Sequence, residues 1–295
     1  MSHIKLIFQE LRPYHWIKNL LIFAPLLISF KSFKITDVYT LLLLFLAFSL
    51  LASSIYIIND IIDRECDKEH PIKKYRPIAS KKINLLEASS LICIMLIIVI
   101  ILCEFFNLGT IIILGGYLVL NLAYSIFLKN LPIIDIFIIA FMYFLRLRAG
   151  GEVIDVYISD WLILVTFFFS LFLIVGKRRA EYKISAKSNH FSRKVLLEYN
   201  DVFLDNLLAV VIAGTILTYS LYAVEATEVK RIPYLIYSAF FVLFGMFRYL
   251  YVIYKHEKGE TPERMIFQDI WLFFTVLLWI LYIFTILYLN AKNII

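Results

Sequence analysis

Long apolar runs are the feature that most limits how this chain can fold. The hydrocarbon core of a bilayer is about 30 Å thick, so a helix needs roughly 20 apolar residues to cross it. Runs of about this length follow one another along the chain, and the second contains no charged residue. The runs cover residues 17–33, 38–58, 85–106, 109–128, 132–149, 161–176, 203–224, 233–254 and 269–289. This pattern predicts an all-α, polytopic membrane bundle of nine transmembrane helices.

The composition supports a membrane protein. Hydrophobic residues make up 62% of the 295 positions and the mean hydropathy is +0.83, which is more apolar surface than a soluble core hides. We expect a single domain over residues 1–295, with a charged surface segment at 1–16 and the bundle at 17–289. The first residues lack the basic end, apolar block and small residues of a cleavable signal. The three cysteines have no metal-ligand spacing and are expected to be free thiols.

The basic residues predict the orientation of the bundle. Loops rich in Lys and Arg stay in the cytoplasm. With nine spans and the N-terminus inside, most of the 29 Lys and Arg residues lie on the inner side, chiefly in residues 59–82 and 177–194. We therefore expect a protein of the cell (inner) membrane whose basic face, with any active site on it, is turned toward the cytoplasm. A net charge of +6 on that face suits anionic lipids and phosphorylated ligands. The chain has no soluble region for nucleic acid.

The stretch "NDIIDRECD" after the second run predicts a metal site. On a helix, the side chains of Asn59, Asp60, Asp63 and Asp67 fall within an arc of about 100°. Oxygen ligands on one face suit Mg²⁺, which binds a few carboxylates and completes its shell with water and substrate phosphate. An ordinary solvated loop is the alternative, but it would not need its carboxylates in register with a transmembrane helix. We predict Asn59, Asp63 and Asp67 as ligands, with Asp60 in support.

Basic residues follow this acidic motif closely. Lys73 and Arg76 come just after Pro71, which is expected to end the helix and turn the chain back. After that turn, their side chains would face the same phosphate groups as the metal.

Several stretches together resemble a known family. "NDIIDRECD" fits the N-D-x-x-D-x-x-x-D signature of the UbiA superfamily of intramembrane prenyltransferases. "LRPYHWIKN", "DKEHPIKKYRPIA", "AYSIFLKNLPIID", "LRLRAGG", "VGKRRAEY" and "GETPE" are similar to segments of its decaprenyl-phosphate phosphoribosyltransferase branch. The superfamily implies a nine-helix bundle with a central cavity open to the cytoplasm and Mg²⁺ on the acidic motif. The branch implies transfer of 5-phosphoribose from phosphoribosyl diphosphate (PRPP) to a polyprenyl phosphate, with release of diphosphate.

One stretch gives an independent check on the branch. Ordinary members of the superfamily carry a second acidic motif after the sixth helix, where this chain reads "GKRRAEYK". Lys177 and Arg178 with a single acid, Glu181, suit direct contact with phosphate oxygens better than a second metal. Asp201 and Asp205 lie one helical turn apart further along and are an alternative second motif. A structural or capping role for them is the favoured interpretation.

The resemblance also assigns substrate-binding residues elsewhere. Lys18 and Asn19 lie at the mouth of the first run, where a phosphate contact is expected. The family stretch "AYSIFLKNLPIID" adds Tyr124, Lys129 and Asp135; Asp135 would bind ribose hydroxyls or orient Lys129, and both alternatives stay open.

The fifth run contains an arginine, Arg146, whose charge would be unfavourable in contact with lipid hydrocarbon. A charge at that depth costs at least about 2.5 kcal/mol, so Arg146 is expected to face the bundle interior. There it pairs with an acid such as Glu152 or lines the cavity as a substrate ligand. Arg148 is expected to point outward, and Gly150 with Gly151 to end the helix.

Two other functions compete with this prediction. An ordinary UbiA-type enzyme would move a prenyl group from a prenyl diphosphate to an aromatic or other acceptor. A transporter or channel would also contain buried ionisable residues, but here the charges cluster on the inner loops. The sequence leaves open whether copies of the chain form a homo-oligomer.

Overall fold

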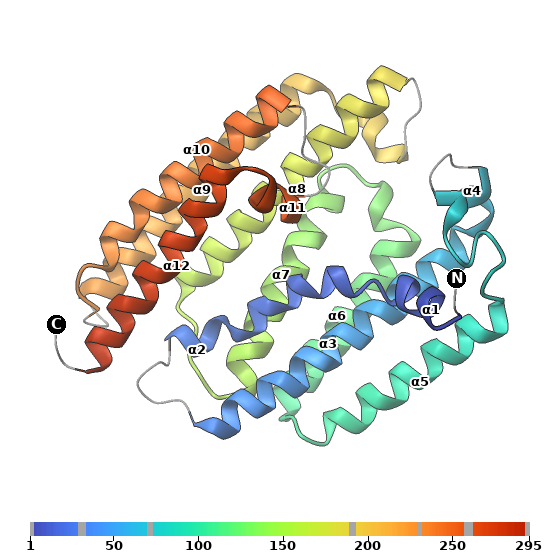
Figure 1. Ribbon diagram of the computed structural model, residues 1–295, viewed down its shortest axis with the longest axis horizontal. Helices are drawn as coiled ribbons and strands as arrows, with labels where there is room; N and C mark the ends of the chain where they lie inside the picture. The colour runs from blue at the N-terminus through green and yellow to red at the C-terminus, as the bar shows by residue number, and fades with distance from the viewer. Residues whose placement is uncertain are drawn as a thin grey trace. The chain divides into compact units, whose positions relative to one another are not determined.

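The computed structural model describes residues 3–28, 34–69, 73–188, 193–228, 232–256 and 262–292, which form helices and connecting segments and no strands (Figure 1). The α-helices are α1 (His3–Leu11), α2 (Ala24–Ile28), α3 (Ile35–Ile62), α4 (Arg64–Glu69), α5 (Leu85–Cys103), α6 (Leu108–Ile126), α7 (Ile134–Val153), α8 (Asp160–Ser188), α9 (Asp201–Glu228), α10 (Ser238–His256), α11 (Pro262–Gln268) and α12 (Ile270–Ala291). The 3₁₀ helices are η1 (Pro13–Phe23), η2 (Lys73–Tyr75), η3 (Leu128–Asn130), η4 (Lys194–Glu198) and η5 (Leu235–Tyr237). The prediction of an all-α fold is confirmed.

Seven segments of the described residues are long and apolar enough to cross a membrane: α3, α5, α6, α8, α9, α10 with η5, and α12. They match seven of the nine predicted runs. The predicted count of nine is not confirmed. Most of the run 132–149 lies on α7, which is not among these seven segments and carries Arg146, Arg148 and Glu152 in its second half. The run 17–33 lies on η1 and α2 as far as Ile28. Residues 29–33 are outside the described part.

Polar contacts explain why η1 is not an ordinary apolar span. A 3₁₀ helix of 11 residues is unusual, because its hydrogen bonds have poorer geometry than those of an α-helix. The indole of Trp16 donates to Ser53 of α3 at 3.1 Å, and the amide of Asn19 donates to Ser49 at 3.0 Å. These contacts bind η1 to α3 along its length.

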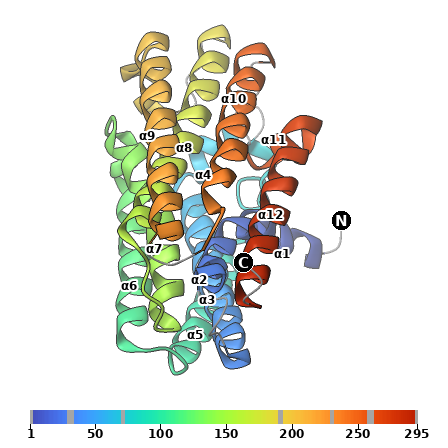
Figure 2. The ribbon, with the colours of Figure 1, turned by 90° about the vertical axis from the view of Figure 1, so that its left-hand side faces the viewer.

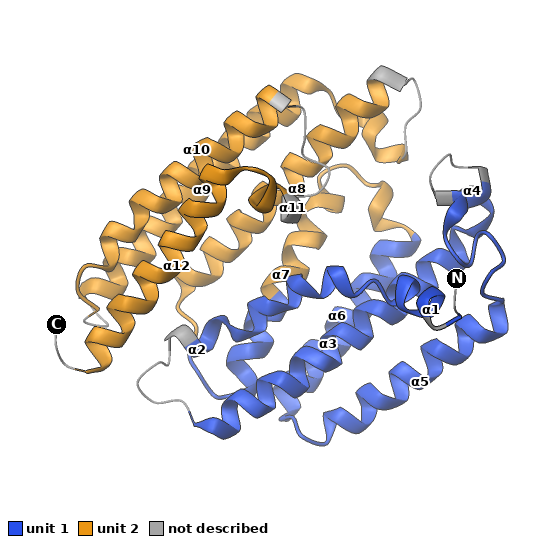
Figure 3. Cartoon of the chain, viewed as in Figure 1, with its two compact units in different colours: residues 1–126, 145–157 blue, residues 127–144, 158–295 orange. Residues whose placement is uncertain are grey.

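The chain divides into two compact units (Figure 3). Unit 1 comprises residues 1–126 and 145–157, and unit 2 comprises residues 127–144 and 158–295. The prediction of a single domain over residues 1–295 stays a prediction.

Unit 1 is built around α3, which contacts α1, η1, α5 and α6. The apolar cluster beneath α1 contains Leu6, Ile57, Ile78 and Met95. Helix α1, which forms part of the predicted surface segment 1–16, is therefore anchored by its apolar side chains. A surface position of the whole segment stays a prediction. By contrast, α5 and α6 expose most of their apolar side chains, as expected of helices that face lipid.

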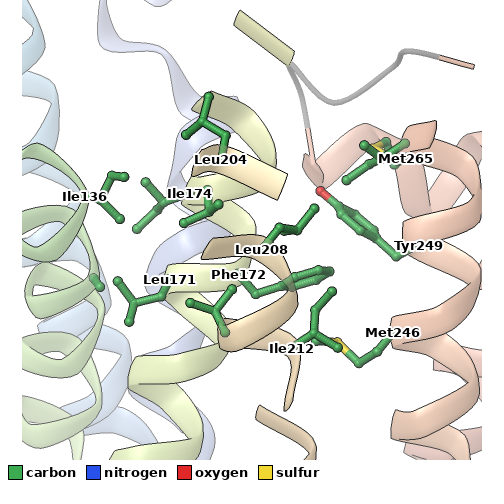
Figure 4. Close-up of a cluster of buried hydrophobic side chains, with 14 of the residues drawn as sticks. Ile136, Leu171, Phe172, Ile174, Leu204, Leu208, Ile212, Met246, Tyr249 and Met265 are labelled. Carbon is green, nitrogen blue, oxygen red and sulfur yellow. The ribbon is translucent and has the colours of Figure 1, made fainter. Parts of the chain in front are cut away.

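Unit 2 consists of long helices packed lengthwise. The most extensive contacts join α8 to α9 and α10 to α12, which lie side by side in Figures 1 and 2. Figure 4 shows the core between them, where the ring of Phe172 lies 4.6 Å from that of Tyr249. Leu204 and Leu208 of α9 are fully buried beside them. This core fixes the part of α8 that continues into the basic stretch described below.

Glycine Gly150 does not end its helix, because α7 continues to Val153. The prediction that Gly150 and Gly151 stop the helix is therefore wrong. A Cβ atom on Gly150 would lie 2.2 Å from the backbone oxygen of Ile22. The glycine is needed because η1 crosses α7 at this point.

Candidate functional site

The acidic motif lies where α3 ends and α4 begins. The backbone N–H of Asp63 donates to the carbonyl of Asn59, and that of Asp67 to the carbonyl of Asp63, both at 2.8 Å. These bonds continue the helical register across the junction, as the sequence predicts. Asp60 and Asp67 are buried, at 2% and 3% exposure, and Asn59 and Asp63 are half-buried.

Two arginines hold the buried aspartates of this motif. Arg76 donates from one nitrogen to Asp60 at 2.9 Å and to Asp67 at 2.6 Å. Arg12 forms an ion pair with the other oxygen of Asp60. Arg76, predicted as a phosphate ligand, thus contacts the acidic motif directly. Asp60 lies between two guanidinium groups, an arrangement that fixes its side chain.

A buried glutamate beside Asp60 was not predicted from the sequence. Glu10 of α1 is 2% exposed and accepts a hydrogen bond from the backbone of Ile78 at 3.1 Å. Burial raises the pKa of Glu10 to about 7, and the nearby Asp60 carboxylate adds to the rise. Only the fold brings Glu10 to this position. Arg12, the ion-pair partner of Asp60, adopts a left-handed backbone conformation, with φ 50°.

The donor atoms of the motif fit Mg²⁺. The side-chain oxygen of Asn59 is buried and has no hydrogen-bond partner, which is costly unless a cation or water supplies one. Amide and carboxylate oxygens are the donors that Mg²⁺ prefers. Within the described ranges, no group of three His, Cys, Asp or Glu side chains is placed to hold a metal. Asp67 is bonded to Arg76, so metal binding there requires that this contact change.

A second cluster in unit 1 surrounds Arg146. Its guanidinium donates to Asn19 at 2.7 Å and to Tyr117 at 2.7 Å, and lies 4.8 Å above the Tyr117 ring. Arg146 is 6% exposed, so the interior position predicted for it is correct. The predicted partner Glu152 instead bonds to Arg148 at 3.1 Å. Two of the predicted ligands, Asn19 and Arg146, are therefore in direct contact.

Unit 2 carries a buried network at the predicted basic stretch. Arg178 donates to Asp135 at 2.7 Å and to Glu181 at 2.7 Å. Arg178 is 1% exposed and Asp135 is fully buried. Glu181 also lies 3.9 Å from Lys177 and 3.4 Å from Arg193. Four predicted site residues, Asp135, Lys177, Arg178 and Glu181, thus belong to one ion-pair network.

Tyrosine Tyr199 completes this network and was not predicted. Its hydroxyl donates to Asp135 at 2.6 Å and accepts from the backbone of Ile133 at 2.7 Å. Burial and the Asp135 carboxylate raise the pKa of Tyr199. Nothing in the local sequence marks this tyrosine, because its partners are more than 60 positions away.

The neighbouring Arg179 has a different acidic partner. It forms an ion pair with Asp205 of α9 and lies 4.0 Å above the ring of Tyr254. Asp201 lies in the first turn of α9. Asp205 therefore serves as the counter-ion of a buried arginine, in agreement with the structural role favoured for it.

The other predicted ligands are distributed over both units. Lys18 on η1, Tyr124 near the end of α6 and Lys129 on η3 are half-buried. Lys73 begins η2, and its side chain lies outside the described part of the structure. Cys93 and Cys103 are free thiols, as expected, and the side chain of Cys66 is not among those described.

Curated relatives share most of the chain. The decaprenyl-phosphate phosphoribosyltransferase of Mycolicibacterium smegmatis is 33% identical over 73% of this chain and 69% of its own length. The enzyme of the same name from Mycobacterium tuberculosis strain H37Rv is 29% identical over 92% of this chain and 91% of its own. The Corynebacterium glutamicum enzyme is 31% identical over 75% and 68%. The resemblance to this branch is confirmed.

Solved structures show the fold. A UbiA homologue from Archaeoglobus fulgidus bound to GPP and Mg²⁺ superposes with a TM-score of 0.72 at 17% identity, covering 96% of this chain and 99% of that one. The structure described for digeranylgeranylglyceryl phosphate synthase gives a TM-score of 0.63 at 18% identity, covering 99% and 100%. Residues 20–273 match the UbiA prenyltransferase family. The chain is an integral, multi-pass membrane protein that belongs to the UbiA prenyltransferase family.

Proposed function

We propose that this protein transfers 5-phosphoribose from PRPP to the phosphate of a polyprenyl phosphate and releases diphosphate. The observation that carries the proposal is the buried network at the basic stretch, where Asp135 and Glu181 fix the guanidinium of Arg178. Arginine is the residue type best suited to phosphate oxygens, and its two carboxylate partners fix the position of its guanidinium. The names of the curated relatives, decaprenyl-phosphate phosphoribosyltransferases, support the same reaction.

The acidic motif would hold the metal. Asn59, Asp63 and Asp67 are its proposed ligands, and Mg²⁺ bound there supplies positive charge for the leaving diphosphate. The unpartnered oxygen of Asn59 supports this assignment, as does the Mg²⁺ bound to the A. fulgidus homologue. Asp60 would act in support, since it anchors Arg12 and Arg76 beside the ligands.

The remaining cations and polar groups would bind the substrates. They offer positive charge or hydrogen bonds to the two phosphates of the donor's diphosphate, its 5-phosphate and the lipid phosphate. The proposed substrate-binding residues are Lys18, Asn19, Lys73, Arg76, Tyr124, Lys129, Asp135, Arg146, Lys177, Arg178 and Glu181. Among these, the carboxylates Asp135 and Glu181 act through Arg178, which they hold in place.

The chemistry requires little proton transfer. An oxygen of the lipid phosphate attacks C1 of the ribose, and the bond from C1 to the diphosphate oxygen breaks with its electron pair on the diphosphate. The attacking oxygen is already anionic at neutral pH, so no strong general base is needed. Catalysis then rests on positioning and charge neutralisation, as in phosphoryl transfer. We place the site on the cytoplasmic face of the cell membrane, where the basic loops are expected.

A labelling experiment tests the proposal. Purified protein in nanodiscs receives Mg²⁺, polyprenyl phosphate and PRPP carrying ³²P in either the 5-phosphate or the diphosphate. We expect only the 5-phosphate label to enter the lipid fraction. Label from the diphosphate in the lipid would indicate diphosphoryl transfer instead. Alkylation of an aromatic acceptor by a prenyl diphosphate, with no label in lipid, would support an ordinary UbiA prenyltransferase. Passage of substrate across the membrane without any product would support a transporter.

A further inference from the structure

A single tyrosine hydroxyl connects the end of η4 with the start of α7, two parts of unit 2 that lie far apart in the sequence. We propose that Tyr199 is a positioning residue: it fixes the carboxylate of Asp135, which in turn holds the phosphate-binding guanidinium of Arg178. The inference rests on the function proposed above and deepens it, because it names the group that keeps the buried arginine in place.

The contacts of Tyr199 are short and buried. Its hydroxyl lies 2.6 Å from Oδ1 of Asp135 and 2.7 Å from the backbone nitrogen of Ile133. The residue is 5% exposed, and its ring stacks on Phe203 with a centroid distance of 5.8 Å and an angle of 9° between planes. The ring is therefore fixed, and the hydroxyl uses both its donor and an acceptor position.

Asp135 passes this constraint on to Arg178. One oxygen of Asp135 accepts from Tyr199, and the other accepts from Nε of Arg178 at 2.7 Å. Because Asp135 is fully buried, an oxygen that loses its donor must find another partner or remain unsatisfied. Loss of the tyrosine hydroxyl is therefore expected to rotate the carboxylate and, with it, the arginine. This assigns Asp135 to the arginine rather than to the ribose hydroxyls.

Tyr199 also restrains a strained backbone position at Ile133. This effect can be separated from its effect on Asp135. Ile133 has φ 66°, a region that β-branched residues rarely enter. Such residues persist where their surroundings hold them in place, and they cluster at functional sites. The hydrogen bond from the Ile133 amide to Tyr199 is one such restraint. A change at Tyr199 would thus loosen this turn as well as Asp135.

The two effects can be separated by four variants of the full-length protein in nanodiscs. Tyr199→Phe removes both hydrogen bonds. Ile133→Gly relieves the strain, since glycine accepts positive φ and the Ile133 side chain is 46% exposed. Tyr199→Phe/Ile133→Gly combines them. Tyr219→Phe is the matched control, because its buried hydroxyl also bonds two side chains, Ser238 and Trp279, outside the proposed site.

Three quantities are measured for each variant: the unfolding midpoint, the Kd of PRPP and of polyprenyl phosphate by equilibrium binding, and kcat with KM. For Tyr199→Phe we expect a lower midpoint, a Kd and KM for one of the two substrates raised roughly tenfold or more, and a kcat within a few-fold of wild type. The double variant should regain the midpoint but keep the weak binding. Tyr219→Phe should lower the midpoint and leave both affinities unchanged.

Recovery of affinity together with the midpoint in the double variant would overturn the inference, since Tyr199 would then only stabilise the turn. Unchanged affinities in Tyr199→Phe would overturn it as well. Because substrate binding is measured apart from transfer, a wild-type protein that binds PRPP without transferring label refutes the proposed reaction and still allows the positioning role to be tested.

Discussion

At the scale of single residues, the polar side chains of the acidic motif have different surroundings. Asp60 is enclosed by Arg12 and Arg76, whereas Asn59 has a buried oxygen without a hydrogen-bond partner. Asp60 thus binds arginines, Asn59 is suited to a cation, and Asp67 is a proposed metal ligand that also contacts Arg76. This division could not be read from the sequence, where all four residues share one face of the helix.

Substitution of the proposed ligands tests the metal site. Asp63→Asn and Asp67→Asn should each lower kcat/KM by at least about a hundredfold, because charge that balances the metal is lost. Both should also abolish the rise in the unfolding midpoint that Mg²⁺ produces in wild-type protein. Glu65→Gln is the control, since Glu65 is exposed and pairs with Lys68. A Mg²⁺-dependent rise that persists in both aspartate variants would contradict the assignment.

Gly150 provides a second test at this scale. Gly150→Ala brings a Cβ atom within 2.2 Å of the Ile22 carbonyl, so η1 or α7 must shift. We expect a loss of about 1–3 kcal/mol in the free energy of unfolding. Gly115→Ala on α6 is the control, because its Cβ meets no atom within 4 Å. Equal stabilities of the two variants would show that the close approach does not matter.

At the scale of elements, α8 places two adjacent arginines against different neighbours. Arg178 is bonded to Asp135 at the start of α7, and Arg179 to Asp205 of α9. Successive helical residues point about 100° apart, so one helix serves both contacts. The basic stretch of α8 is thereby fixed from two sides.

The role of Asp205 can be tested against that of a metal ligand. Asp205→Asn should lower the unfolding midpoint, because the buried Arg179 loses its counter-ion. The Mg²⁺ concentration at half-maximal activity should not change. Asp201→Asn, in the same helical turn, should affect neither quantity. A marked shift in the Mg²⁺ requirement of either variant would instead indicate that Asp201 and Asp205 bind a second metal ion.

Helix α12 is capped at its N-terminus by an aspartate whose charge should make the stability of the protein depend on pH. Asp269 accepts from the backbone of Leu272 at 2.9 Å and from Arg248 at 2.9 and 2.7 Å. The bond from Arg248 lowers the pKa of Asp269. A lowered pKa in the folded state means that Asp269 stabilises the fold above its unfolded pKa of about 3.9. This contribution is lost as the pH falls through the folded value.

Asp269→Asn isolates that charge, because asparagine still caps a helix. The variant should be less stable than wild type at neutral pH, and the difference should shrink as the pH falls below about 4. Asp269→Ala should lose about 1 kcal/mol more, from the cap. Thermal unfolding between pH 3 and pH 7 measures both effects. A difference that does not change with pH would show that the ion pair contributes nothing.

At the scale of the whole molecule, the length of the apolar runs was enough to predict the fold class and seven helices, since a bilayer demands long apolar segments. The run length did not predict the 3₁₀ helix η1, whose side chains bond to serines of α3. Nor could the sequence show that Gly150 is needed where η1 crosses α7. Glu10 and Tyr199 were missed for the same reason: their partners lie far away in the sequence. The site residues came mainly from family motifs, and their roles stay predictions.

The central claim is that the chain joins a phosphoribosyl group to a lipid phosphate. Mass spectrometry of the lipid fraction tests it most directly, after incubation of wild-type protein with unlabelled PRPP, Mg²⁺ and a polyprenyl phosphate of defined length. We predict a product whose mass equals the acceptor plus one phosphoribosyl group, with one diphosphate released per product. An unchanged acceptor, or one that has gained a diphosphate group, would contradict the claim.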